Sequence, residues 1–204
     1  MRSGGARGRY IWIVGPDGCG KSSLADGMAH QLQALHRYWR PTVLPLARTL
    51  VGRQQPDGTN ARPHAVTANS AWREQARLLY YVTDYVLGYW IVVRPALLRG
   101  QDVIIERGWH DMIVDWRRYA LRSSEGAARL ARLVREPDLL MIVAVPPDVA
   151  HGRKPELAHE EIARQYRAWD KVPLRRAQRV HLDNTPEFPS VLSRAVDIVQ
   201  AGRA

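Results

Sequence analysis

Short apolar runs are spread along the chain and are separated by longer amphipathic segments. Each run is rich in aliphatic residues and is bounded by charges or by helix-breaking residues, which is typical of strands buried on both faces of a sheet. The runs expected to form strands are Tyr10–Val14, Val103–Ile105, Leu139–Val145 and Arg179–Leu182, with a further short strand around Tyr38–Trp39.

Helical periodicity fills most of the intervals between these runs, because apolar residues recur there at spacings of three and four. The segments expected to be helical are Ser23–Leu35, Ala71–Arg99 with an interruption near Gly88 or Pro95, Glu125–Arg135, Glu156–Lys171 and Pro189–Val199. Strands that alternate with helices favour a mostly parallel sheet covered on both faces. The sequence therefore predicts one three-layer α/β/α domain over residues 1–204, with about five parallel strands and a flexible tail at residues 1–9.

Length and composition restrict the class of protein. The chain has 204 residues, of which 46% are hydrophobic and 25% charged, as in an ordinary globular domain. No stretch reaches the roughly 18 apolar residues that a membrane helix needs, and the apolar run after the basic N-terminus is too short for a signal peptide. A single cysteine excludes an internal disulfide. These features predict a cytoplasmic protein without a membrane partner.

The formal net charge of +10 has three interpretations: a nucleic-acid partner, a GC-rich genome that favours arginine, or a site for anionic substrates. The basic residues are spread over the whole chain and form no dense block, which disfavours a nucleic-acid partner. A small anionic substrate remains the partner that the charge indicates. The oligomeric state is not determined by the sequence, and a homodimer is left open.

The segment GPDGCGKSS, residues 15–23, fits the whole G-x-x-x-x-G-K-[ST] pattern and lies between a predicted strand and a predicted helix. Glycines allow positive φ angles, so that successive N–H groups can point at an anion at the start of the helix. Lys21 would reach the β and γ phosphates of ATP, and the Ser22 hydroxyl would take a Mg²⁺ position. The alternative is a glycine-rich hairpin. The residues expected to contact ATP here are Gly15, Gly18, Cys19, Gly20, Lys21, Ser22 and Ser23.

Carboxylates at two positions extend this prediction. Asp17 would be repelled by the phosphates of ATP, so we expect it to point at the group that receives the phosphoryl, where it could hold a hydroxyl. Its alternative is a turn-forming Asp. Glu106 ends a predicted strand and is followed by Arg107, so the pair could hold a metal-bound water and a phosphate. The alternative for this pair is a local ion pair.

These residues resemble the thymidylate kinase family of nucleoside monophosphate kinases. GPDGCGKSS is similar to the family's G-x-D-G-x-G-K-S-T/S, and Glu106-Arg107 stands at its Asp-Arg. Arg153-Lys154 resembles the family's basic lid, here at residues 151–156, and RLLYYVTDY resembles its substrate helix. The resemblance covers nearly the whole chain in order. It implies the P-loop NTPase fold, with ATP and Mg²⁺ bound and a phosphoryl group transferred to a small anionic acceptor.

The resemblance also implies roles for individual side chains. Asp17 would hold the acceptor's sugar hydroxyl, and Arg107 would contact the acceptor phosphate. Arg153 would bind ATP and stabilise charge on the transferred group, as an arginine finger supplied by the same chain. Tyr81 would stack on the substrate base. The catalytic residues would then be Lys21, Arg107 and Arg153, and the metal would be held at Ser22 and Glu106.

The chain departs from the family pattern on the acceptor side. Glu106 replaces the usual Asp, and Tyr85 stands where the family has its base-reading Arg. Arg40, followed by a proline, is the nearest substitute for the family's Arg-Glu-Pro-Gly, and the tract Pro45–Asn69 also differs. Arg77 is a candidate to read the base in place of Tyr85.

Charged residues that follow Glu106-Arg107 could line the acceptor pocket or could be ordinary solvated charges. They are Asp111, Asp115, Arg117 and Arg118. The full set expected to bind the acceptor is Asp17, Arg40, Arg77, Tyr81, Tyr85, Arg107 and Asp111.

The sequence supports three functions. The first is a nucleoside monophosphate kinase of thymidylate type, and the second is a small-molecule kinase that acts on a sugar, a nucleoside or a secondary metabolite. The third is a nucleotide-binding regulatory module without turnover. Asp17 and the basic lid favour an enzyme, because a module without turnover has no need of them.

Overall fold

A five-stranded parallel sheet forms the centre of the computed structural model, which describes residues 7–44 and 71–202. The strand order is β2-β3-β1-β4-β5. The strands are β1 (Tyr10–Val14), β2 (Leu35–Tyr38), β3 (Val103–Glu106), β4 (Leu139–Ala144) and β5 (Gln178–Asp183). The predicted parallel sheet is confirmed, and the tract Pro45–Asn69 lies outside the described residues.

Eight α-helices lie in the described part of the chain. They are α1 (Lys21–Leu32), α3 (Ala71–Gly88), α4 (Arg94–Leu98), α5 (Asp111–Val114), α6 (Glu125–Leu130), α7 (Pro147–Arg153), α8 (His159–Lys171) and α9 (Phe188–Ala201). A π-helical turn at Tyr89–Val93 joins α3 to α4, and a 3-10 turn at Ala131–Leu133 follows α6. The interruption expected near Gly88 therefore takes the form of a π-turn, not a break in the chain.

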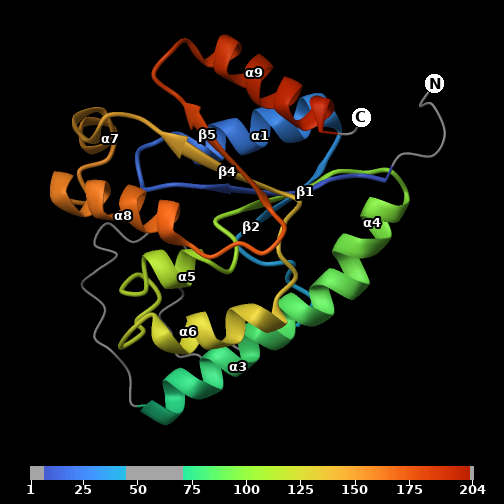
Figure 1. Ribbon diagram of the computed structural model, residues 1–204, viewed down its shortest axis with the longest axis vertical. Helices are drawn as coiled ribbons and strands as arrows, with labels where there is room; N and C mark the ends of the chain where they lie inside the picture. The colour runs from blue at the N-terminus through green and yellow to red at the C-terminus, as the bar shows by residue number, and fades with distance from the viewer. Residues whose placement is uncertain (1–6, 45–70, 203–204) are drawn as a thin grey trace.

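Helices cover both faces of the sheet (Figure 1). α1 and α9 pack together over one face, where Ile11 and Ile13 of β1 are buried. α3, α4, α5 and α6 lie over the opposite face, where Tyr10, Trp12 and Val14 are buried. Because both faces are covered, β1 is apolar at every position instead of alternating. The predicted three-layer α/β/α arrangement is confirmed.

Several predicted boundaries were wrong. The first helix ends at Leu32, because Gln33 adopts a left-handed conformation with φ of 51°, and Leu35 already belongs to β2. Trp39 lies just after β2 and has a positive φ of 62°. α5 and α7 were not predicted, since helices this short show little periodicity.

The predicted tail at residues 1–9 is too long. The backbone N–H of Gly8 donates to the carbonyl of Leu97 at 2.9 Å, and that of Arg9 donates to Asp102 Oδ1 at 2.8 Å. The Arg9 guanidinium also donates to the carbonyls of Ile198 and Val199 at the end of α9. Gly8 and Arg9 therefore belong to the domain, and residues 1–6 lie outside the described part.

The strand order determines where a ligand can bind. β1 lies between β3 and β4, so the segments that follow β1 and β3 emerge side by side at one edge of the sheet. In open α/β sheets this carboxyl edge is where ligands bind. Among the described residues, no helix combines the length and the apolar character that crossing a membrane requires.

Candidate active site

The phosphate loop connects β1 to α1 and depends on glycine at two close approaches. Gly18 has φ of 83°, and a Cβ there would lie 2.1 Å from the carbonyl oxygen of Ala150 in α7. Gly20 has φ of 89°, and a Cβ there would lie 2.2 Å from Asn184 Nδ2. Only glycine fits both positions, so the loop wraps tightly over the start of α1. The first N–H groups of that helix have no partner within the helix and favour an anion.

Lys21 places its ammonium inside the loop. Its side chain is buried, and Nζ donates to the carbonyl of Pro16 at 2.7 Å. The same nitrogen lies 3.6 Å from Asp17 Oδ1. Lys21 therefore sits between the anion cradle and the residue that was expected to face the acceptor.

Ser22 and Glu106 come together from different elements. The Ser22 hydroxyl, in the first turn of α1, donates to Glu106 Oε1 at the end of β3 at 2.9 Å. Glu106 is 2% exposed. Hydroxyl and carboxylate oxygens are suitable ligands for Mg²⁺. This ion usually takes its other ligands from water and substrate phosphates.

Asp17 is the meeting point of the loop and the segment after β3. One of its oxygens accepts from Arg107 and the other accepts from Arg118. Burial alone would raise the pKa of Asp17, but the charges of Arg107, Lys21 and Arg118 outweigh burial and hold it well below its usual range. Asp17 is therefore ionised, and it is stabilised by three cations.

Arg107 is oriented by contacts on three sides. Its backbone has a positive φ of 75°, which turns the chain sharply after β3. Besides Asp17, its guanidinium donates to the Tyr38 hydroxyl at 3.1 Å and to Asp111 at 3.2 Å. Burial raises the pKa of Asp111 although Arg107 opposes this shift. Asp111 also accepts from the Tyr119 hydroxyl at 2.6 Å.

Aromatic rings surround Arg40 on the acceptor side. The ring of Trp39 stacks on Tyr119 with centroids 5.1 Å apart and meets Tyr81 edge to face at 4.8 Å. The Arg40 guanidinium lies 5.0 Å from the Trp39 centroid and 5.4 Å from that of Tyr81. It also pairs with the buried Asp84 at 2.9 Å. Tyr81 is thus close to Arg40, and both are buried.

Tyr85 and Arg77 point their polar atoms at the protein backbone. The Tyr85 hydroxyl donates to the carbonyl of Trp39, and burial raises the pKa of Tyr85 well above its usual value. Arg77 Nη2 donates to the carbonyl of Ala120 at 2.8 Å. In the structure as it stands, each of these side chains supports the loops around the acceptor region.

Arg153 ends α7 and lies beside the phosphate loop. The position that a Cβ would take on Gly20 is 3.9 Å from Arg153 Nη1. Lys154 pairs with Glu156 at 3.8 Å. The predicted lid at residues 151–156 thus consists of the last turn of α7 and the exposed segment that follows it.

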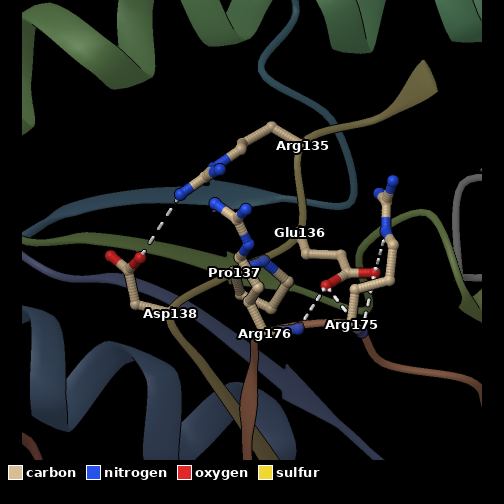
Figure 2. A pocket seen from close by; sticks show the side chains of 6 residues that line it. All are labelled: Arg135, Glu136, Pro137, Asp138, Arg175 and Arg176. Carbon is tan, nitrogen blue, oxygen red and sulfur yellow. Dashed lines mark hydrogen bonds and ion pairs between the residues drawn. The ribbon is translucent and has the colours of Figure 1, made fainter. Parts of the chain in front are cut away.

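A cavity of about 290 Å³ lies at the opposite end of the sheet, before β4 and β5 (Figure 2). Two of its three arginines already have acidic partners: Arg175 Nε donates to Glu136 at 3.0 Å, and Arg135 lies 3.9 Å from Asp138. None of the residues predicted for the site lines this cavity. The candidate active site is therefore the carboxyl edge around the phosphate loop, and not this cavity.

Sequence reasoning missed two contributors and left a third undecided. Asn184 follows β5 and donates from Nδ2 to the carbonyl of Cys19 at 2.7 Å, which fixes the phosphate loop. Tyr38, at the end of β2, orients Arg107. Arg118 had two equally ordinary interpretations, and the structure buries it against Asp17. An Asn directly after the predicted strand Arg179–Leu182 was the signal available for Asn184, whereas Tyr38 carried no distinctive motif.

Comparison with known proteins agrees with this geometry. No family model matches the chain. A thymidylate kinase from Synechococcus sp. (strain CC9902) is 29% identical over 168 residues, covering 76% of this chain and 77% of that protein. The structure of thymidylate kinase from Candida albicans, described as revealing the origin of its broad substrate specificity, superposes with a TM-score of 0.66 at 15% identity. That alignment covers 98% of this chain and 94% of that one.

The thymidylate kinase from Ehrlichia chaffeensis gives a TM-score of 0.61 at 17% identity, over 95% of this chain and 100% of that one. These structural likenesses establish the P-loop NTPase fold, and the likeness in sequence agrees with the motifs at the site. The chain therefore has the fold of these P-loop kinases and is similar in sequence to a thymidylate kinase.

Proposed function

We propose that this chain transfers the γ-phosphoryl group of ATP to a nucleoside monophosphate of thymidylate type. One observation carries the proposal: Asp17, inside the phosphate loop, is ion-paired with Arg107, which follows β3. The residues suited to the donor and those suited to an anionic acceptor therefore meet at a single point. A loop that only bound a nucleotide would not need this connection.

Three basic side chains would act on the transferred group. Charge in such a transition state spreads over the non-bridging oxygens, so positioned cations lower the barrier. Lys21 would follow the β and γ phosphates, and Arg107 would hold the acceptor phosphate. Arg153 would approach the phosphoryl group when the lid closes and excludes water, which also prevents wasteful hydrolysis.

Ser22 and Glu106 would hold the magnesium ion. When bound, the ion neutralises charge on the β and γ oxygens of ATP. Glu106 is one methylene longer than the Asp of related proteins, and its contact with the Ser22 hydroxyl keeps the two oxygen donors together. The loop contacts proposed for ATP remain Gly15, Gly18, Cys19, Gly20 and Ser23, together with Lys21 and Ser22.

A second candidate is a kinase of the same kind with an acceptor other than thymidylate. The observation that favours it is the Tyr85 hydroxyl, which donates to the carbonyl of Trp39 and not into an open pocket. An adaptable pocket discriminates far less between bases than a site built on a fixed hydrogen bond. The Candida albicans relative is described as having broad substrate specificity. The acceptor side of this chain would then be Arg40, Tyr81 and Asp111 with Asp17 and Arg107.

A homodimer and a cytoplasmic location complete the proposal. Large apolar side chains are exposed along α3, the π-turn and α4, which form one long rod at the margin of the molecule (Figure 1). They are Trp72, Leu79, Leu87, Trp90, Ile91 and Leu98. An exposed apolar face of this extent marks an interaction site, and a single helical face that contacts its own copy suits a two-fold dimer. The lone cysteine, Cys19, is free and buried, which suits a reducing compartment.

The test is a screen of ATP consumption in the presence of Mg²⁺ and a panel of acceptors. The panel contains nucleoside monophosphates, nucleosides and sugar phosphates. The proposal predicts turnover that depends on a nucleoside monophosphate. Turnover only with a nucleoside or a sugar phosphate would assign the chain to another class of small-molecule kinase. Binding of ATP without turnover on any acceptor would identify a nucleotide-binding module.

A further inference from the structure

Five buried charged residues alternate in sign across the candidate site. They run in the order Asp111, Arg107, Asp17, Arg118 and Asp115, and each is in contact with the next. All five are at most 5% exposed. Asp17 belongs to the phosphate loop, whereas the other four follow β3. The resemblance to the thymidylate kinase family gives roles to Asp17 and Arg107, but none to Arg118.

Arg118 is held in one orientation by its own segment. Its Nε donates to Asp115 at 3.1 Å, three residues earlier, and its Nη2 donates to Asp17. Burial and the neighbouring Arg107 lower the pKa of Arg118, but Asp17 and Asp115 outweigh them and raise it, so the side chain stays charged. Its Nη1 makes no hydrogen bond to any residue within 7–44 and 71–202. A buried guanidinium thus retains donors for which the described protein supplies no acceptor.

The adjacent Arg117 shows that this arrangement is particular to Arg118. The Arg117 side chain is 49% exposed, lies over the ring of Trp116 and approaches Glu161 at 3.8 Å. It therefore faces away from Asp17. Two neighbouring arginines with equal sequence signals have different surroundings, and only one of them is directed at the phosphate loop.

We propose that Arg118 is a second arginine of the acceptor site and binds the phosphate of the acceptor together with Arg107. This assignment rests on the proposed function. Guanidinium groups bind phosphate through paired, charge-assisted hydrogen bonds, and the bond to Asp115 fixes the plane of the fork. Asp17 keeps the two arginines apart and aligned while each offers its remaining N–H groups. The acceptor class that this site selects is a phosphate monoester, in preference to an uncharged nucleoside or sugar.

Arg118→Ala, Arg118→Lys and the control Arg117→Ala test the assignment. The probe is thymidylate or, if another member of the panel is better, the monophosphate with the highest kcat/KM. Its dissociation constant is measured by calorimetry on protein without ATP, and KM is measured separately for the acceptor and for ATP. Loss of charge-assisted bonds to a phosphate should weaken acceptor binding by about 10- to 100-fold in Arg118→Ala. The KM for ATP should stay at the wild-type value.

Arg118→Lys should restore only part of the affinity, because an ammonium cannot reproduce the planar fork. Arg117→Ala should behave as wild type. A merely structural Arg118 would lower thermal stability and leave the acceptor constants unchanged, which would overturn the assignment. Loss of the folded state in both Arg118 variants would overturn it as well. A wild-type protein that binds no monophosphate would refute the proposed function itself, and this failure is visible before any variant is made.

Discussion

At the scale of single residues, the site is a set of buried charges that compensate one another. Lys21, Arg107 and Arg118 surround Asp17, and Asp111 and Asp115 support the two arginines from behind. Burying one of these charges without its partners would cost several kcal/mol. The phosphate loop and the segment after β3 are therefore bound to each other through Asp17, so a change on one side should affect the other.

Arg153 should act on the transition state more than on bound ATP. Its guanidinium lies near Gly20 but makes no hydrogen bond to the described residues, so its main contact should form as charge develops on the phosphoryl group. Arg153→Ala should lower kcat by about 10³-fold or more and change the KM for ATP little. Steady-state kinetics with ATP varied at saturating acceptor measures both. A change in KM alone would make Arg153 a ground-state binder, and no change would make residues 151–156 a surface segment.

Tyr85 should leave the enzyme with weak selectivity for the base. Its hydroxyl donates its one hydrogen to the Trp39 carbonyl, so it does not offer a base the fixed donors that an arginine would. An adaptable pocket discriminates by roughly 10- to 200-fold. The ratio of kcat/KM for thymidylate to that for other pyrimidine monophosphates should fall in this range or below it. A preference above about a thousandfold would show that another side chain, with Arg77 the first candidate, reads the base.

At the scale of elements, the loop-to-helix transition after β3 carries two of the residues proposed to bind the acceptor, Arg107 and Asp111. Glu106 ends the strand, Arg107 turns the chain, and α5 starts at Asp111. His110 directly precedes α5 and is buried against Trp12 at 5.3 Å between ring centroids. Among the described residues its Nδ1 has no hydrogen-bond partner. Protonation of His110 would therefore place a buried positive charge at the start of α5.

Burial lowers the pKa of His110 to about 4, from an ordinary value near 6.5. In the unfolded chain this histidine binds a proton below about pH 6.5, whereas in the folded protein it binds one only below about pH 4. The free energy of unfolding therefore decreases as the pH falls through this window. The loss from this group between pH 7 and pH 5 is about 2 kcal/mol. Urea unfolding at both pH values should show a smaller loss for His110→Gln than for wild type. The control His30→Gln, at an exposed position, should keep the wild-type loss. Equal losses in all three proteins would refute this account of His110.

The elements were predictable where burial leaves a strong pattern. The strands β1, β3 and β4 were located from apolar runs, because a strand covered on both faces has apolar side chains throughout. β5 gave a weaker run, since only Leu182 of its residues is fully buried. β2 was placed too late, since its residues Leu35–Tyr38 are only partly buried and include His36 and Arg37. The start of α1 followed from the phosphate loop, but its end did not, because Gln33 in a left-handed conformation is a backbone feature without a sequence signal there.

The candidate site was predictable where a motif fixes both residue type and spacing. Lys21, Ser22 and Glu106 belong to such motifs, and the structure brings Ser22 and Glu106 together. The role of each predicted residue stays a prediction until it is measured. Arg118 could not be separated from Arg117, because both are arginines in a segment without helical periodicity and only tertiary packing buries one of them.

At the scale of the whole molecule, the edge that carries the phosphate loop is separate from the surface proposed for the dimer. The phosphate loop lies at the carboxyl edge of the sheet, and the exposed apolar residues belong to α3, the π-turn and α4, which form the rod at the margin of the molecule (Figure 1). A dimer formed through α3 would brace the helix that carries Tyr81 and Tyr85. Dimer formation would thereby stabilise residues proposed to bind the acceptor and would leave the candidate site open.

Sedimentation analysis should give twice the chain mass of 23.2 kDa. Leu79→Glu with Trp90→Glu places two charges on the exposed apolar face and should yield a monomer, because a buried unpaired carboxylate is costly. Arg194→Glu, at an exposed position on α9 over the other face of the sheet, is the control and should remain dimeric. A wild-type monomer at micromolar concentration would contradict the dimer.

Direct detection of both products tests the central claim. Wild-type protein, ATP, Mg²⁺ and each nucleoside monophosphate of the panel are incubated, and the nucleotides are separated. The account predicts equal amounts of ADP and nucleoside diphosphate with at least one acceptor. Lys21→Ala should lower this turnover by at least about 100-fold while the protein stays folded, because Lys21 is the cation inside the phosphate loop. ADP without a phosphorylated acceptor, or near-wild-type turnover by the variant, would contradict the account.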